Sequence, residues 1–172
     1  ERGLYPYSSK YLAAVKKRTG YYWHNHFNTI GIIGMHEALL NFMSRGIETP
    51  EGQDFAIEVM NYLRDLMVTF QNETGNVFNL EATPAEGTSY RLALLDKKDY
   101  EDIITSGEEV LIKQFTQLPV GYTDDIFEVL DLQDELQSLY TGGTVQHLYL
   151  GEAIEDIQVC KRLIQKIFTQ YK

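Results

Sequence analysis

Residues 79–91 read Asn-Leu-Glu-Ala-Thr-Pro-Ala-Glu-Gly-Thr-Ser-Tyr-Arg, and this stretch decides how the fold is interpreted. Residues 76–82 have the composition of a short strand, residues 83–89 that of a tight loop, and residues 90–96 that of a helix. A strand, a loop of small residues and a helix in this order are typical of an α/β unit. The sequence therefore predicts parallel strands that alternate with helices.

The same alternation continues on both sides of this stretch. Strands are predicted at residues 27–33, 115–120 and 144–150, and helices at residues 11–17, 34–44 and 49–72 and after residue 125. The last helix is expected to bury an apolar face formed by Ile154, Ile157, Leu163, Ile164, Ile167 and Phe168. This order predicts an open α/β domain or about half of a barrel, with its ligand site at the carboxyl ends of the strands.

The longest predicted helix has clear signals at both ends. Thr49 is a suitable N-cap, Pro50 suits the first turn, and Gly75 is a suitable stop. One face is expected to be apolar, and it comprises Phe55, Val59, Leu63, Leu66, Met67 and Phe70.

Composition and charge limit the possible partners. The chain of 172 residues suits one domain, residues 1–172, and its net charge of −10 excludes nonspecific nucleic-acid binding, because it repels a phosphate backbone. A single nucleotide needs only a few local donors, so nucleotide binding is not excluded. The start at Glu1 suits a piece cut from a longer polypeptide.

The single cysteine and the absence of long apolar runs suggest the compartment. Cys160 permits no disulfide within the chain and is expected to be a small buried residue of the last helix. No apolar run approaches the ~20 residues that span a bilayer. We therefore expect a cytoplasmic protein with no membrane partner.

The loop at residues 83–89 is the first candidate binding site. Backbone amides at a helix start are unpaired and bind anions, Thr83, Thr88 and Ser89 add hydroxyl groups, and Gly87 permits close approach of the backbone. No lysine follows the glycine, so the loop is not a Walker motif. The alternative is an ordinary capped loop between a strand and a helix.

Two further motifs each have a structural alternative. Residues 117–125 could line a site or could simply end a strand and cap the next helix. The pair Gly142 and Gly143 could bring backbone close to a ligand, although a turn is the favoured interpretation.

The histidines and two glutamates are weaker signals. His24, His26 and His36 are more typical of core or rim residues than of a metal site, although His26 could face the mouth of a barrel. Glu81 and Glu86 could form an acid–base pair, but acidic residues at a helix start also complement the helix dipole. The structural role is favoured for both.

Four blocks of sequence, in order, resemble the anaerobic (class III) ribonucleoside-triphosphate reductases, which are glycyl-radical enzymes. Residues 26–31 and 34–38 resemble the HFxTIG and GMNEA segments of that family, and residues 70–75 and 79–91 resemble its QEETG and NLEATPAEGTxYR segments. Residues 116–125 resemble TQLPVxYTDD, and residues 131–147 resemble DLQDELQxxYTGGTVxH. The chain is therefore identified as an internal piece of a member of this family.

The resemblance implies a ten-stranded α/β barrel that reduces ribonucleoside triphosphates to deoxyribonucleotides. It implies a glycyl radical, made by a separate radical S-adenosylmethionine iron–sulfur activase, and a cysteine thiyl that abstracts the ribose 3′ hydrogen; many members use formate as reductant. The radical cysteine would precede these blocks, and the zinc cysteines and glycyl-radical motif would follow them. No catalytic residue, metal ligand or cofactor is therefore assigned to this chain.

The implied partners are a ribonucleoside triphosphate, the remainder of the reductase chain, a second subunit in a homodimer, and the activase. By the same resemblance, the triphosphate would bind at the helix start after Thr83, and the ribose side of the barrel mouth would include residues 117–119. The expected substrate-binding residues are Thr83, Pro84, Ala85, Glu86, Gly87, Thr88, Ser89, Gln117, Leu118, Pro119, His26 and Asn28.

The sequence departs from the family pattern before residue 116. The family carries a longer, YYTNS-like stretch there, whereas residues 111–115 run directly into Thr116. A shortened loop would alter the neighbouring substrate contacts.

Two other functions remain open from the sequence. One is a non-catalytic nucleotide-binding or regulatory module with the same fold. The other is a hydrolase that uses Glu81 or Glu86 with a histidine, which would require these groups to lie within hydrogen-bonding reach.

Overall fold

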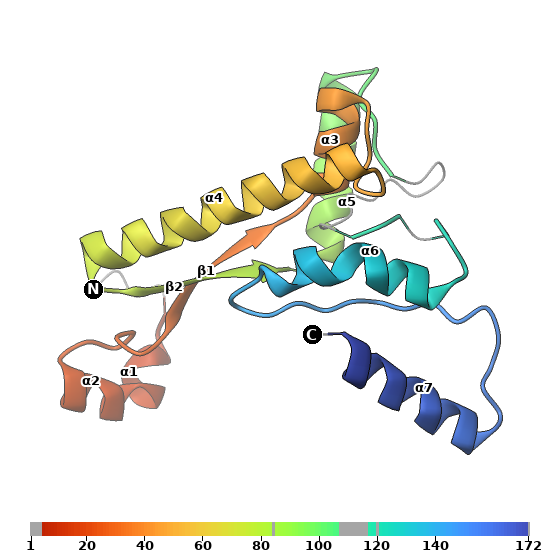
Figure 1. The fold of residues 1–172 in the computed structure, drawn as a ribbon. Coiled ribbons are helices and arrows are strands. Elements are labelled where there is room, and N and C mark those ends of the chain that lie inside the picture. The colour runs from red at the N-terminus through yellow and green to blue at the C-terminus, as the bar shows by residue number, and fades with distance from the viewer. Residues whose placement is uncertain (1–4, 84, 107–116, 120, 172) are drawn as a thin grey trace.

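The computed structural model describes residues 5–83, 85–106, 117–119 and 121–171 (Figure 1). Within these residues the elements are, in order, α1 (Ser8–Tyr11), α2 (Ala13–Thr19), β1 (Phe27–Ile32), α3 (Met35–Met43), α4 (Pro50–Thr74), β2 (Val77–Ala82), α5 (Glu86–Asp99), α6 (Ile126–Ser138) and α7 (Ile157–Gln170). The helices predicted from residues 34–44 and 49–72 and the strands predicted from residues 27–33 and 76–82 are confirmed.

The two strands lie side by side and run in the same direction. Their register extends to the pair Ile32 and Ala82, so both carboxyl ends meet at one edge of the sheet. On the other side of β2, Gly143 forms one parallel bridge with Glu81, and its carbonyl accepts a hydrogen bond from the amide of Ala82 at 3.2 Å. A third segment of chain therefore joins the sheet at its carboxyl end.

The other two predicted strands are not observed. Half of residues 115–120 lies outside the described residues, and the described part, residues 117–119, is irregular. The strand predicted at residues 144–150 is wrong, because this segment is irregular. Its alternating pattern is not sufficient, since a strand also needs a neighbour with which to form a hydrogen-bonded ladder. The described residues thus form a small parallel sheet with helices, rather than a sheet of four strands.

Helix α4 begins where its capping signals predict. The hydroxyl of Thr49 accepts a hydrogen bond from the amide of Gly52 at 3.1 Å, and Gly75 ends the helix in the left-handed conformation, with φ 69°. The predicted apolar face is confirmed in part, because Met67 is buried and Phe55, Val59 and Leu63 pack partly buried against the core. Ala56 and Met60, which were not predicted, are fully buried. A small side chain at Ala56 allows the helix to pack closely against the core. Within the described residues, no helix combines the length and apolar character needed to cross a membrane.

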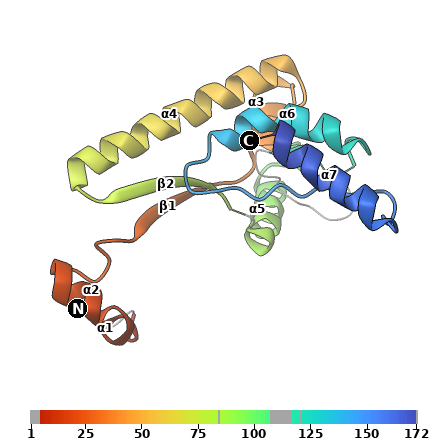
Figure 2. The ribbon, with the colours of Figure 1, turned by 60° about the horizontal axis from the view of Figure 1, so that its bottom comes forward.

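Alternation along β2 gives the sheet two different faces. Leu80 and Ala82 are buried and face α4, which runs along the sheet (Figures 1 and 2). Val77, Asn79 and Glu81 point to the opposite side, which α4 does not cover. We call that side the open face. The core on the covered side comprises Met35, Leu39, Ile47, Ala56, Met60, Leu80, Ala82, Leu118, Leu136 and Tyr140.

Helix α7 does not bury the apolar face that its sequence predicts. Ile157 is 79% exposed and Phe168 is 84% exposed, and α7 contains no buried residue. Cys160, which was expected to be buried, is only partly so. The helix is tied to α6 at its end, where the hydroxyl of Tyr171 donates to Asp131 at 2.6 Å. A periodic apolar pattern predicts a face that can be buried, but it does not say which surface covers it.

Candidate functional site

The first turn of α5 lies at the carboxyl end of β2 and has no side-chain cap. Its N-cap residue, Ala85, adopts a left-handed conformation with φ 34° and ψ 35° and accepts no side-chain capping bond. In contrast, Thr49, Asp125 and Asp156 cap α4, α6 and α7 with side-chain oxygens. The first amides of α5 therefore remain available to an anion at the edge where the parallel strands end.

The loop before α5 is shorter than predicted. The helix begins at Glu86 rather than near Tyr90, so residues 86–89 form its first turn. Gly87 and Thr88 are exposed, whereas Ser89 is only 2% exposed, which removes its hydroxyl from solvent. The positive end of the helix dipole therefore lies four residues after the end of β2, which favours anion binding there.

The remaining predicted residues of this loop are placed as follows. Thr83 and Ala85 are half-buried. The hydroxyl of Thr83 lies over Gly31 of β1, because a Cβ added to Gly31 would be 2.3 Å from Thr83 Oγ1. Pro84 and the side chain of Glu86 lie outside the described part of the structure.

The second motif packs against the same end of the sheet. The side chain of Gln117 is buried and donates a hydrogen bond to the carbonyl of Val145, two residues after Gly143. Leu118 is buried in the core beside the covered face, and Pro119 is half-buried. The structure therefore brings residues 117–119 to the strand end together with residues 143–145.

The glycine pair does more than form a turn. The amide of Gly142 donates to the carbonyl of Leu80 at 2.7 Å, and the amide of Leu80 donates to Thr141 Oγ1 at 3.0 Å. A Cβ added to Gly142 would lie 2.8 Å from side-chain atoms of Asn79. The pair thus allows backbone to lie directly against β2.

A chain of side chains holds this segment in place, and the sequence analysis missed it. Gln137 donates to the side chain of buried Gln133 at 3.0 Å, and its own side-chain oxygen accepts a hydrogen bond from Thr144. These residues fix Thr144 to α6. The spacing of four residues between the two glutamines was the available signal, because it places them on one helix face.

The structure separates His26 and Asn28 from the α5 end. Both lie at the amino end of β1, where the side chain of Asn28 donates to the carbonyl of Val77 at 3.1 Å. The ring of His26 contacts that of Trp23, with centroids 5.1 Å apart. A strand of six residues is about 20 Å long, so neither residue joins Thr83 at the opposite end.

The structure gives no support for a hydrolytic pair or a metal centre. Within the described residues, no hydrogen bond joins Glu81 to a histidine, and no group of three or more His, Cys, Asp or Glu side chains converges. His36 is buried on α3, and its Nδ1 accepts from the amide of Ile47 at 3.3 Å. His36 is therefore a core residue, as the sequence indicates.

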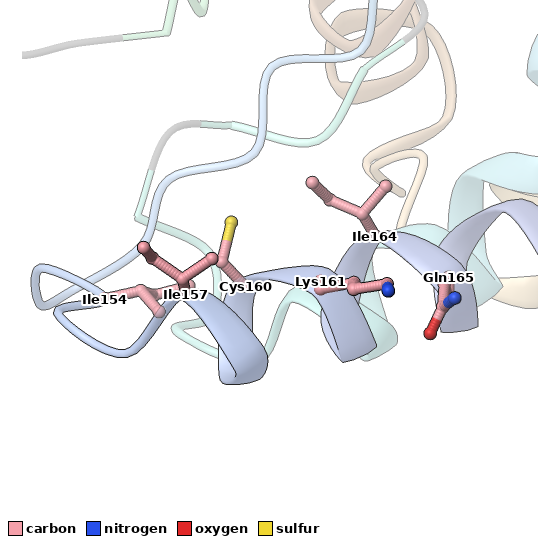
Figure 3. Close-up of a pocket in the computed structure, with 6 residues that line it drawn as sticks. All are labelled: Ile154, Ile157, Cys160, Lys161, Ile164 and Gln165. Carbon is pink, nitrogen blue, oxygen red and sulfur yellow. The ribbon is translucent and has the colours of Figure 1, made fainter.

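A separate hollow lies on α7 and has a different character. It is lined by Ile154, Ile157, Cys160, Lys161, Ile164 and Gln165, and three of these side chains project from one side of the helix (Figure 3). The side chains that project together are Ile157, Cys160 and Ile164. The surface is mainly apolar and lacks the polar groups of the strand end, so it is not part of the candidate site.

One sequence family matches the chain. The model of the family described as anaerobic ribonucleoside-triphosphate reductase matches residues 1–172. The chain is 24% identical over 119 residues to the anaerobic ribonucleoside-triphosphate reductase of Haemophilus influenzae, an alignment that covers 68% of this chain and 17% of that protein.

Solved structures share the fold. The anaerobic ribonucleotide reductase from Thermotoga maritima with MES in the active site has a TM-score of 0.68 at 23% identity, over 83% of this chain and 24% of that chain. The same reductase in complex with dATP and CTP has a TM-score of 0.65 at 21% identity, again over 83% and 24% of the two chains. The chain thus spans less than a quarter of the length of these relatives, and its fold is the one found in that part of them. Since the family model matches residues 1–172, the chain belongs to the anaerobic ribonucleoside-triphosphate reductase family.

Proposed function

We propose that residues 1–172 form part of the substrate-binding region of an enzyme that reduces ribonucleoside triphosphates to deoxyribonucleotides. The observation that carries this proposal is the uncapped first turn of α5 at the carboxyl edge of the parallel strands. Family membership supplies the reaction class, and the helix start supplies a place for a polyanion. A related reductase has been solved with dATP and CTP, which is consistent with a nucleotide ligand.

In this proposal the triphosphate lies against the first turn of α5. The amides of residues 86–88 would donate to phosphate oxygens, and the hydroxyl of exposed Thr88 would add a further donor. Gln117, Leu118 and Pro119 would support the neighbouring wall through the contact of Gln117 with Val145. His26 and Asn28 are not included, because they lie at the other end of β1.

The rest of the enzyme would supply the radical chemistry. We infer a ten-stranded α/β barrel, a homodimer, an activase partner, and a glycyl radical and zinc site formed by other segments of the reductase. The one cysteine of this chain, Cys160, lies on α7 and not at the strand end, so it is not placed to carry a thiyl radical at the substrate. This chain would bind and orient the nucleotide, and would exclude water, while other segments carry the radical.

Substitution of Gly87 tests the phosphate position. A Cβ at Gly87 meets no atom within 4 Å, and an aspartate in the first turn of a helix complements the dipole. Gly87→Asp should therefore fold normally but repel the triphosphate, weakening its binding by about tenfold or more. The matched neutral control is Gly87→Asn, and calorimetry on the full-length protein with each ribonucleoside triphosphate measures both.

The outcomes distinguish the possible functions. Equal affinities of the aspartate and asparagine variants would show that the triphosphate does not bind at α5. Nucleotide binding by the wild-type protein without reduction, in the presence of activase and reductant, would favour a non-catalytic nucleotide-binding module instead.

A further inference from the structure

The carboxylate of Glu81 occupies an unusual position on the open face. In the sheet register, Glu81 pairs with Gly31 of β1 on one side and with Gly143 on the other. Both neighbours lack a side chain, so the Glu81 side chain is the only one at this level of the three adjoining segments. On the Gly143 side, where an added Cβ would meet no atom within 4 Å, this leaves space beside the carboxylate, whereas Thr83 fills the space over Gly31.

Polar groups surround this position. The hydroxyl of Thr83 lies over Gly31, next to Glu81 on the same face. Two residues further back along β2, Asn79 has a buried side-chain oxygen without a hydrogen-bond partner among the described residues. The open face therefore presents the Glu81 carboxylate and, at the strand end, the Thr83 hydroxyl, whereas the Asn79 oxygen is buried.

The charge of the site indicates which groups it would receive. Within the described residues, no Lys or Arg forms an ion pair with Glu81, and no cluster of metal-binding side chains includes it. A carboxylate without a cation or metal prefers hydroxyl or N–H donors, and its two oxygens match two adjacent hydroxyl groups. The same charge repels phosphate, which would be held instead at the positive end of α5.

We propose that Glu81 determines specificity for ribose by accepting hydrogen bonds from the vicinal hydroxyls of the nucleotide, and that Thr83 assists it. This inference rests on the proposed function, because it assumes that the triphosphate of the same nucleotide binds at the first turn of α5. One residue, Ala82, lies between Glu81 and Thr83, so these two residues are about 7 Å apart along the extended chain. That separation suits a sugar whose phosphates extend toward α5.

The test compares ribonucleoside triphosphates with their 2′,3′-dideoxy counterparts in the full-length protein. Calorimetry gives the affinity ratio of the two ligands for the wild type, Glu81→Gln and the matched control Glu58→Gln, whose side chain is exposed on α4. Loss of the charged acceptor should lower the preference for the ribose form by about tenfold, with little change in affinity for the dideoxy form. Glu58→Gln should keep the wild-type ratio.

Failure of this inference is distinguishable from failure of the proposed function. An unchanged ratio in Glu81→Gln, or a wild type without preference for ribose, would overturn the role of Glu81 while leaving the α5 site intact. Loss of nucleotide binding altogether, or indifference to Gly87→Asp, would count against the α5 site. If Glu81→Gln does not fold, Glu81→Asp, which keeps the charge but withdraws it by one methylene, should give an intermediate ratio.

Discussion

At the scale of single residues, close contacts across the sheet determine how the strand end is built. Gly31 has no room for a side chain, since the hydroxyl of Thr83 occupies the position of its Cβ. Gly142 is similarly pressed against Asn79. Each glycine is required by a neighbour that is distant in the sequence, so its role follows from packing and not from a local turn.

We predict that Gly31→Ala destabilises the protein by about 1–3 kcal/mol, because the new methyl group overlaps Thr83 Oγ1. The change in free energy of unfolding is measured from denaturant curves. Gly151→Ala is the control, since a Cβ there meets no atom within 4 Å. The double variant Gly31→Ala/Thr83→Ala should recover part of the loss, and strict additivity of the two substitutions would contradict this contact.

At the scale of elements, α7 is anchored to α6 mainly through its C-terminal end. The Tyr171 ring stacks near Phe127, with centroids 6.5 Å apart, and Lys166 lies 3.7 Å from the centroid of the Phe127 ring. The hydrogen bond from Tyr171 to Asp131, together with the nearby negative charge, raises the pKa of Tyr171 to about 12. The hydrogen bond to Asp131 in the folded protein therefore favours the neutral phenol of Tyr171.

This contact predicts a pH dependence in the alkaline range. Because the folded pKa is raised, the contribution of Tyr171 is complete below its ordinary value of 10.0 and is lost as pH rises through about 12. Absorbance of the phenolate, taken as the difference between wild type and Tyr171→Phe, should show a midpoint near 12. Asp131→Asn should move that midpoint toward the ordinary value, and an unchanged midpoint would exclude Asp131 as the cause.

At the scale of the whole molecule, the described fold does not enclose its own apolar surface. The chain exposes 12,092 Å², whereas a compact monomer of its 19.8 kDa mass would expose about 8,600 Å². Large exposed side chains include Ile157 and Phe168 of α7 and Phe27 of β1. Surface of this kind is normally covered by further protein.

We predict that residues 1–172, expressed alone, associate or precipitate. The exposed face of α7 and the edge of β1 both favour contacts between copies. Size-exclusion chromatography with light scattering measures the mass in solution. Ile164→Lys with Phe168→Lys should reduce the association, while Lys161→Arg, which keeps the charge on the same helix, should not. A soluble monomer at high concentration would contradict the prediction.

The sequence by itself determined the helix and strand positions that depend on neighbouring residues. Thr49 and Gly75 are the two ends of α4 because capping is a local interaction. Strand β2, Val77–Ala82, lies within the predicted residues 76–82 and is followed by the predicted helix. The family, and the placing of a helix start at the end of a parallel strand, were also predictable. The sequence did not predict the early start of α5, because left-handed Ala85 is a rare conformation for a residue with a side chain.

Only the tertiary structure decided which residues meet. It placed Gly31 and Gly143 on either side of Glu81, brought Gln117 to Val145, and left His26 at the far end of the sheet. It also showed that residues 144–150 form no strand and that α7 leaves its apolar face uncovered. These outcomes depend on contacts between distant segments. Periodicity and capping depend on residues that are close in the sequence, so they do not predict which surface packs against a helix or strand.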